Sequence, residues 1–304
     1  MTATQLAPSA PAARGIWSKI KPNHLVSALV TLILVLGQWR FKILESHPLT
    51  GLWFIDDYLV LMTSLGTSML SEALFSRWLR GHWSSVLSAY VSGNSIVILT
   101  KPQAGILWPF FLGALISITS KYVLMYRNRH LWNPTNFAIS FMLLAAPGSV
   151  AILSHEWGNE PWTVGVIWCV GLLVVTRAKL LHITLTYLVC FVMLGGLRAA
   201  LNGSSWLTEI APVTGPMYQL LMFFMLTDPR TTVSSTKGRM LVVVLIALAE
   251  CGLRIANDQH QAWAAPFATA PAIFALAVIG PIAMWLDLRK QPVPLRAGLA
   301  TTAA

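Results

Sequence analysis

Long apolar stretches recur along almost the whole chain, and they constrain its fold more than any other feature. A helix that crosses a bilayer needs about 20 mostly apolar residues. Ten stretches follow this pattern: 24–40, 55–76, 85–100, 104–125, 134–150, 162–176, 180–198, 211–227, 240–256 and 265–286. The first, third and sixth are short, which leaves the count open by one. We therefore expect an all-α, polytopic membrane protein with about ten transmembrane helices.

Composition excludes the other classes of protein. Of the 304 residues 56% are hydrophobic and only 11% are charged, against about 25% charged residues in a soluble domain. Such apolar content excludes intrinsic disorder, and three cysteines are too few for a disulfide scaffold. The basic residues form no long cluster, so we expect the lipid bilayer, and no nucleic acid, as a partner. No metal site is expected, because neither Cys-x-x-Cys nor His-x-x-x-His occurs.

The distribution of lysine and arginine predicts the orientation. With ten spans and a cytoplasmic N-terminus, the inner segments hold sixteen of the 21 basic residues, and the outer segments hold Arg40, Lys42, Lys101, Arg198 and Arg254. Cytoplasmic loops carry the excess of such residues. We therefore expect a multi-pass protein of the cell membrane with both termini in the cytoplasm, where residues 1–22 and 288–304 form flexible tails.

A weak internal repeat divides the chain. Ala-Tyr-Val-Ser-Gly at 89–93 matches Ala-Pro-Val-Thr-Gly at 211–215, and Leu-Thr-Lys-Pro at 99–102 matches Leu-Thr-Asp-Pro at 226–229. Two five-helix repeats, 23–150 and 151–287, would follow. Because five is odd, the second repeat would enter the membrane inverted, and such repeats place a binding site near the midplane at helices interrupted by Gly or Pro. Close helix packing at small residues is the alternative explanation.

Three motifs resemble those of one family. His-Leu-Trp-Asn-Pro at 130–134 resembles the His-x-x-Asn-Pro that opens a span in the NqrB/RnfD family, membrane subunits of ion-translocating NADH:quinone and ferredoxin:NAD oxidoreductases. Phe-Phe-Met-Leu-Thr-Asp-Pro at 223–229 resembles that family's Phe-Phe-Met-x-Thr-Asp-Pro, and Ser-Ala-x-x-Ser-Gly at 88–93 resembles its Ser-Ala-x-x-Thr-Gly helix. The resemblance covers about residues 80–286 and implies ten spans in two inverted halves.

One departure concerns the cofactor. Family members with covalent FMN carry Ser-Gly-Ala-Thr in the outer loop, whereas this loop, 201–209, reads Leu-Asn-Gly-Ser-Ser-Trp-Leu-Thr-Glu. The chain therefore resembles a stand-alone branch without covalent FMN, some members of which belong to natural-product clusters such as enediyne pathways. The resemblance implies a non-covalent flavin, riboflavin or FMN, and other redox or biosynthetic subunits as partners.

Nine residues in or directly after these motifs and repeats are the candidate cofactor-binding site: Ser92, Gly93, Asn133, Thr135, Asn136, Thr214, Gly215, Thr227 and Asp228. The helix-start amides at Asn133 would grip a polar ligand group, although a simple N-cap followed by proline explains the same residues. A capping or solvated carboxylate likewise explains Asp228.

Two acids lie near the ends of apolar stretches. An acid inside a membrane is a functional candidate. Glu250 lies four residues before Arg254, which is a helical pairing distance. Glu72 has no basic residue four positions later, which makes it a candidate for proton or ion handling. The alternative is an ion pair with Arg77 or Arg80, which lie near the same end of the stretch.

These observations leave three functions open. The first is a membrane redox component resembling NqrB/RnfD that holds a flavin or a quinone-like ligand in the core between the repeats. The second is a transporter or channel-like protein for a small solute, and the third is a scaffold for biosynthetic enzymes. The sequence contains no Walker loop, no Gly-x-Ser-x-Gly and no dinucleotide fingerprint, so whether the chain is an enzyme stays open, and its catalytic residues stay unknown.

Overall fold

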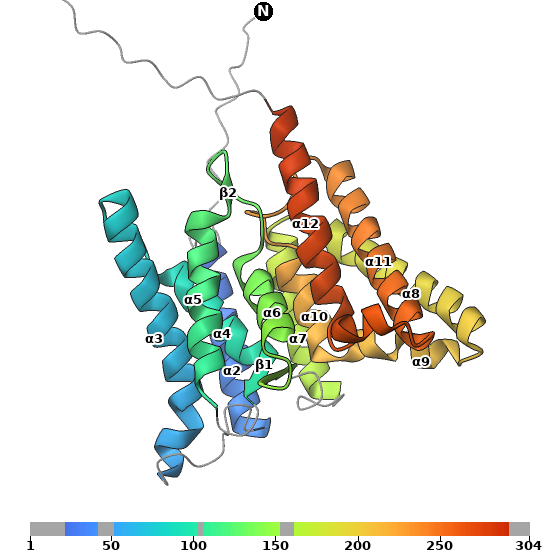
Figure 1. Ribbon diagram of the computed structural model, residues 1–304, viewed down its shortest axis with the longest axis horizontal. Coiled ribbons are helices and arrows are strands. Elements are labelled where there is room, and N and C mark those ends of the chain that lie inside the picture. Colours follow the sequence, from blue (N-terminus) through green and yellow to red (C-terminus); the bar gives the residue numbers. More distant parts are fainter. Residues whose placement is uncertain (1–21, 42–51, 103–105, 153–160, 292–304) are drawn as a thin grey trace, which may run out of the picture.

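The computed structural model describes residues 22–41, 52–102, 106–152 and 161–291, and the fold is almost entirely helical (Figure 1). The long helices are α2 (Pro22–Phe41), α3 (Trp53–Arg80), α4 (Leu87–Leu99), α5 (Trp108–Val123), α6 (Pro134–Ala145), α7 (Pro161–Arg177), α8 (Leu181–Asn202), α11 (Thr236–Asp258) and α12 (Pro271–Lys290). Between α8 and α11 the chain forms short pieces: α9 (Trp206–Ile210), the 3₁₀ turn η2 (Ala211–Thr214), α10 (Pro216–Leu220) and the π-helical turn η3 (Leu221–Met225). A second 3₁₀ segment, η4 (Ala262–Phe267), precedes α12.

Short strands complete the fold. Strands β1 (Thr100–Pro102) and β4 (Val150–Ile152) pair antiparallel, with Thr100 opposite Ile152. They join the end of α4 to the segment after α6. Strands β2 (Met125–Tyr126) and β3 (Arg129–His130) form a hairpin between α5 and α6.

Within the described residues, four helices are long and apolar enough to cross a membrane: α3, from Tyr58 to Arg80, α8, α11 and α12. Shorter apolar helices lie at 24–40, 87–99, 134–145, 164–177 and 216–225. Large apolar side chains on the outer faces of the long helices are exposed, among them Met62, Met193, Leu241 and Val278. An apolar outer surface of this kind suits a lipid environment, which agrees with the expected membrane protein.

Every predicted stretch overlaps a helix, but three boundaries were wrong. The stretch 134–150 ends as a helix at Ala145 and continues into β4. The stretch 265–286 begins in η4, and its helix starts only at Pro271. The stretch 211–227 is divided because Gly215 has an extended ψ of 146° that no helix can continue through.

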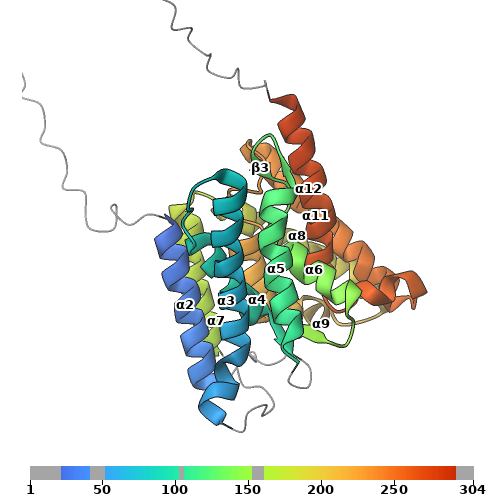
Figure 2. The same cartoon turned by 60° about the vertical axis from the view of Figure 1, so that its left-hand side comes forward.

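The predicted tails lie mostly outside the described residues. The parts that are described are helical, since α2 begins at Pro22 and α12 continues through residues 288–290. The start of α2 and the end of α12 lie on the same face of the molecule (Figures 1 and 2).

The long helices alternate in direction between two faces. The ends of α3 and α5 meet where Arg80 stacks on Tyr122, 4.6 Å from the ring centroid. The start of α4 joins them through Ser88, which accepts a hydrogen bond from Lys121. The β2–β3 hairpin reaches the end of α12, where Arg127 donates to the carbonyl of Leu288 at 2.6 Å. This face also carries the ends of α7 and η3 and the starts of α6 and α11 (Figures 1 and 2).

The same order of helix pairing recurs in the two halves of the chain. In the first half α2 packs on α4, α3 on α5 and α5 on α6. In the second half α7 packs on α10, α8 on α11 and α11 on α12. The halves meet where α2 contacts α7 and where α6 contacts α12, so α3 and α5 lie at one side of the molecule and α8 and α11 at the other (Figure 1).

Candidate functional site

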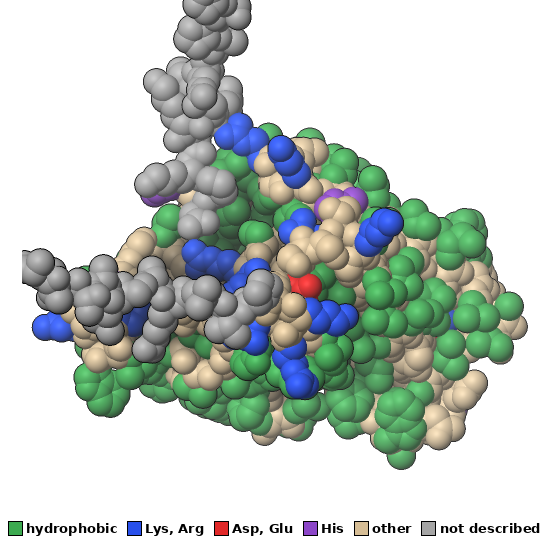
Figure 3. Space-filling view, turned by 90° about the horizontal axis from the view of Figure 1, so that it is seen from above, with side chains coloured by type: hydrophobic (Ala, Val, Ile, Leu, Met, Phe, Trp, Pro, Cys, Tyr) green, Lys and Arg blue, Asp and Glu red, His purple; other side chains and the backbone are tan. Residues whose placement is uncertain are grey.

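A cavity of about 280 Å³ lies between the two halves and is lined by both of them. The first half contributes α2, α4, the end of α5 and the start of α6, and the second half contributes the end of α7, α10, η3 and residues 228–230. Ligand pockets usually have volumes of about 300–1,000 Å³, so this cavity is slightly smaller than that range. Lysine and arginine side chains gather on the face where these helix ends meet (Figure 3).

Two of the three sequence motifs, at 130–134 and 223–229, meet at this cavity. The Asn133 side chain donates from Nδ2 to Oδ2 of Asp228 at 3.1 Å. Arg129 strengthens the junction by donating to the carbonyls of Pro229 and Arg230 at 3.0 and 3.2 Å. The start of α6 and the segment after η3 are therefore held together as one polar wall.

Asn133 also caps α6. Its Oδ1 accepts a hydrogen bond from the backbone N–H of Asn136 at 3.0 Å, and Pro134 occupies the first helical position, where no N–H is needed. The predicted N-cap is therefore confirmed. The cap uses Oδ1 as an acceptor and the contact with Asp228 uses Nδ2 as a donor, so capping and site formation use different atoms of one side chain.

The structure brings together five of the nine predicted site residues. Ser92, Asn133, Thr135, Thr227 and Asp228 line the cavity. Gly93, Asn136, Thr214 and Gly215 do not appear in its lining. The Thr227 hydroxyl donates to the carbonyl of Phe223, so toward a ligand it can act only as a hydrogen-bond acceptor.

Gly93 serves packing rather than a break in the helix. Helix α4 is continuous through it, and Ser64 on α3 donates to its carbonyl at 2.9 Å. A Cβ at this position would lie 2.5 Å from Oγ of Ser68. The expectation of two interrupted helices is thus wrong for α4, because a small residue here allows α3 and α4 to approach closely.

The break in the other helix, at Thr214 and Gly215, lies outside the cavity lining, although α10 and η3 after it line the cavity. Thr214 is exposed and Gly215 is half-buried, and the chain reverses into α10 directly after them. Gln219 donates from Nε2 to the carbonyl of Thr214 at 2.6 Å, which closes this turn. Asn136 is buried behind the cavity wall, where its Nδ2 donates to the carbonyl of Ile273 on α12 at 3.0 Å.

The π-helical turn is a feature of the site that sequence reasoning missed. Leu226 donates its N–H to the carbonyl of Leu221, five residues earlier, at 2.9 Å. This wide turn places Phe223, Phe224 and Met225 all in the cavity lining. Single π-helical turns are frequent at functional sites, but the apolar run Leu-Met-Phe-Phe-Met carries no sequence signal that separates one from an ordinary helix.

Lys121 was also missed as a site residue. It is 5% exposed, lines the cavity, and donates from Nζ to Ser88 at 2.9 Å and to Glu72 at 3.5 Å. Tyr122 donates to Oε1 of Glu72 at 2.8 Å. The prediction that Arg77 or Arg80 pairs with Glu72 was wrong, because α5 packs on α3 and brings Lys121 closer.

A second buried polar cluster lies in the other half. Glu250 accepts hydrogen bonds from Tyr187 at 2.6 Å and Tyr218 at 2.7 Å, and Arg254 pairs with it at 3.0 Å. The predicted pairing of Glu250 with Arg254 is confirmed. Each carboxylate oxygen has a tyrosine donor, so the cluster is saturated and serves to join α8, α10 and α11.

His130 adds a titratable group to the cavity wall, in the β2–β3 hairpin. Burial lowers the pKa of this imidazole below its usual 6.5, and the nearby charges of Arg230, Lys121 and Arg80 lower it further, whereas Asp228 opposes the shift. Its Nδ1 is buried and has no partner within the described part of the chain. The ring therefore lies in a surrounding that favours its neutral form.

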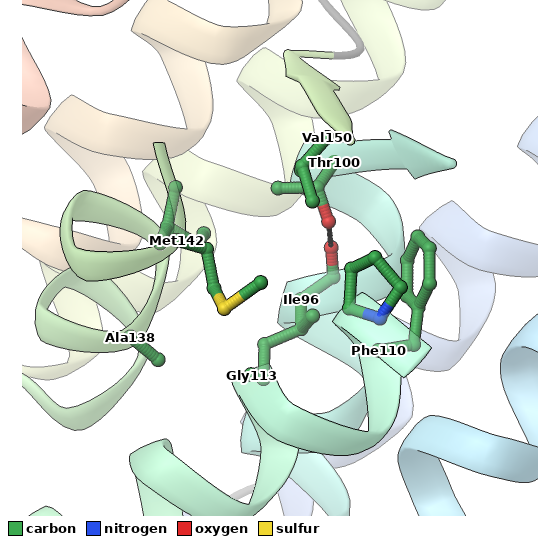
Figure 4. A pocket seen from close by; sticks show the side chains of 9 residues that line it. Ile96, Thr100, Phe110, Gly113, Ala138, Met142 and Val150 are labelled. Carbon is green, nitrogen blue, oxygen red and sulfur yellow. Dashed lines mark hydrogen bonds between the residues drawn. The ribbon is translucent and has the colours of Figure 1, made fainter. Parts of the chain in front are cut away.

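A second hollow between α4, α5 and α6 is a packing gap. It measures about 10 Å³ and is lined by apolar side chains such as Ile96, Phe110 and Met142 (Figure 4). The hydroxyl of Thr100, its one polar side chain, already donates to the carbonyl of Ile96 at 2.6 Å. Nothing in this gap could orient a ligand.

These features describe a helical protein with several helices suited to a membrane and a polar-walled cavity between its two halves. Within the described ranges, no three side chains of His, Cys, Asp or Glu come together to hold a metal ion. No protein-family model matches the chain, and no curated protein is significantly similar to it.

Proposed function

We propose that the chain is a polytopic membrane protein whose ten helical segments all cross the bilayer, five in each of two inverted halves, with both tails in the cytoplasm. The alternating helix directions and the recurring order of packing support this topology. The gathering of basic residues at one end supports the orientation.

Helices α4 and α6 are too short to cross a bilayer alone, since 13 and 12 residues extend about 20 Å against a hydrocarbon thickness of about 30 Å. Irregular backbone at membrane depth is tolerated where protein surrounds it. The chain leaves α4 at buried residues, Leu99 and Thr100, so this short helix is compatible with a crossing. After α6 the chain is exposed or half-buried at residues 145–149 and becomes buried again only at Val150.

The cavity is the proposed ligand site. It binds a flavin, or a quinone-like molecule, non-covalently, and the protein takes part in membrane electron transfer, as its resemblance to NqrB/RnfD implies. The observation that carries this proposal is the hydrogen bond between Asn133 and Asp228, because it unites two family-like motifs from different halves at one cavity. Natural-product biosynthesis of the enediyne type is the setting that the same resemblance implies.

Cofactor analysis tests this function. The full-length protein, purified in mild detergent, should show flavin absorbance, and acid extraction should release free riboflavin, FMN or a quinone. Ser95→Phe, which fills the cavity from α4, should abolish the bound cofactor. Val189→Phe on the exposed face of α8 is the matched control and should retain it. A colourless protein with no extractable flavin or quinone would overturn the proposal.

A transporter or channel-like protein for a small solute is the second candidate. The interrupted segment from α9 to η3 favours it, because broken helices beside a cavity are typical of transporters. Uptake of a solute into proteoliposomes by cofactor-free protein, blocked in Ser95→Phe, would favour this function over electron transfer.

A further inference from the structure

The charge on the cavity wall is unbalanced. Among the described residues that line it, Lys121, Arg177 and Arg230 are cations and Asp228 is an acid. Most of the other lining residues are apolar and buried, among them Val30, Ile33, Ile98, Leu220 and Phe223. The cavity thus combines an apolar interior with a predominantly basic end.

Within the described residues, the Asp228 carboxylate forms no ion pair with Lys121 or with the Arg230 side chain. Its Oδ2 accepts hydrogen bonds from Asn133 and Thr231, both at 3.1 Å, and its Oδ1 accepts from the backbone N–H of Arg230 at 3.0 Å. These bonds hold the carboxylate against the turn that follows η3. The Arg230 backbone is fixed at the same time, because Arg129 donates to its carbonyl.

Lys121 carries a charge that membrane topology does not require. Basic residues that orient a membrane protein lie in its loops and near the ends of its spans, as the exposed Lys237 does in the first turn of α11. Lys121 on α5 is instead buried, at 5% exposed. Its ammonium group has three hydrogen-bond donors, and the described residues give it two partners, Ser88 and Glu72. One N–H is therefore available to a group in the cavity.

Burying such a charge is costly unless an opposite charge completes its pairing. Glu72 pairs with it only at 3.5 Å and also accepts a hydrogen bond from Tyr122 at 2.8 Å. Phosphate or carboxylate oxygens would accept from Lys121 on the wall and from Arg230 at the mouth, since charge-assisted hydrogen bonds to these groups are strong.

We propose that the cavity takes an amphipathic ligand with an anionic head, a phosphate or a carboxylate, held by Lys121 and Arg230 while its apolar body lies against η3 and α4. This inference rests on the proposed function for the location of the site, and it adds the class of ligand. For a flavin, it selects the phosphorylated form over the neutral one.

Two matched pairs of probes test the inference: FMN with riboflavin, and 1-naphthyl phosphate with 1-naphthol. A ligand that binds the folded state raises the melting temperature, so each pair is compared in thermal unfolding of the full-length protein in detergent. We expect the phosphorylated member to bind at least tenfold more tightly in one pair or both, with a preference that falls as salt screens the charges.

Three variants locate the effect. Arg230→Gln at the exposed mouth should remove most of the preference without affecting folding, and Lys121→Met should do the same where it folds. Lys237→Gln, an exposed lysine away from the cavity lining, is the matched control and should keep the preference.

The outcomes separate the two proposals. Equal binding of both members in both pairs, no binding of either phosphate, or an undiminished preference in Arg230→Gln would overturn the anionic-head inference. Flavins that bind equally leave the flavin proposal standing. A preference for naphthyl phosphate with no binding of either flavin supports the anionic head and refutes the flavin.

Discussion

Gly171 on α7 faces the ring of Phe223 in the π-helical turn, and this contact gives a sharp test of the packing beside the cavity. A Cβ built at Gly171 would lie 2.8 Å or less from three ring carbons of Phe223, whereas ordinary contacts are 3.4–4 Å. The ring is fully buried, and Trp168 packs edge-on against it with ring centroids 5.2 Å apart. The ring therefore has little room to move away.

Gly171→Ala should consequently destabilise the protein. Overpacking of a buried contact costs about 1–3 kcal/mol, which corresponds to a fall in melting temperature of roughly 2–6 °C for a chain of this size. Tryptophan fluorescence of the detergent-solubilised protein would follow the transition, at one fixed scan rate because membrane proteins often unfold irreversibly.

The control lies on the same helix. A Cβ added at Gly165 would meet no atom within 4 Å, so Gly165→Ala should be neutral or should stabilise by about 0.4–1 kcal/mol, since alanine favours helix. Phe223→Leu should relieve the clash, and the double variant with Gly171→Ala should then be more stable than the sum of the two single effects. If Gly171→Ala had the same melting temperature as Gly165→Ala, or if Phe223→Leu did not reduce the destabilisation caused by Gly171→Ala, the packing described for η3 would be refuted.

Three further predictions concern polar groups. Asn133→Ala should lower the free energy of unfolding by about 1–2 kcal/mol through loss of the cap. Asn133→Ser should lower it less, because serine can also cap a helix. Equal melting temperatures of these two variants would contradict the capping role. Glu250→Ala should cost about 3–5 kcal/mol, because it leaves Arg254 and two tyrosine hydroxyls buried without their acceptor; size-exclusion profiles showing as much folded protein as wild type would argue against it. The lowered pKa of His130 means that the unfolded chain binds more protons, so its contribution to stability is complete above pH of about 6.5 and is lost below it. His130→Gln should therefore shrink the fall in melting temperature on acidification, and an unchanged fall would exclude this histidine as the cause.

Much of the helical layout could be predicted from local pattern. The apolar stretches predicted where helices occur, and the Asn-Pro pair predicted the start of α6, because capping depends on residues only three positions apart. One boundary failed because apolar content alone overlooks a local stop signal. Residues 146–150 read Ala-Pro-Gly-Ser-Val and Gly148 has a φ of 87°, so α6 cannot continue, and β4 pairs instead with β1, some 50 residues earlier.

The candidate site could be predicted only in part. Motif resemblance selected Asn133 and Asp228, which do meet. It also selected Gly215, which the break before α10 places away from the cavity lining. Lys121 had no motif to mark it, and its position on the wall follows from how α5 packs against α3 and α4.

The order of apolar and basic segments by itself determined that the chain is helical and suited to a membrane, because burying backbone polar groups in lipid requires helices whatever their neighbours. Only the tertiary structure decided which polar residues share a cavity and which serve packing. Side chains such as Asn133 and Asp228 lie 95 positions apart, and no local rule of spacing sets the distance between groups that are joined through the packing of two separate halves.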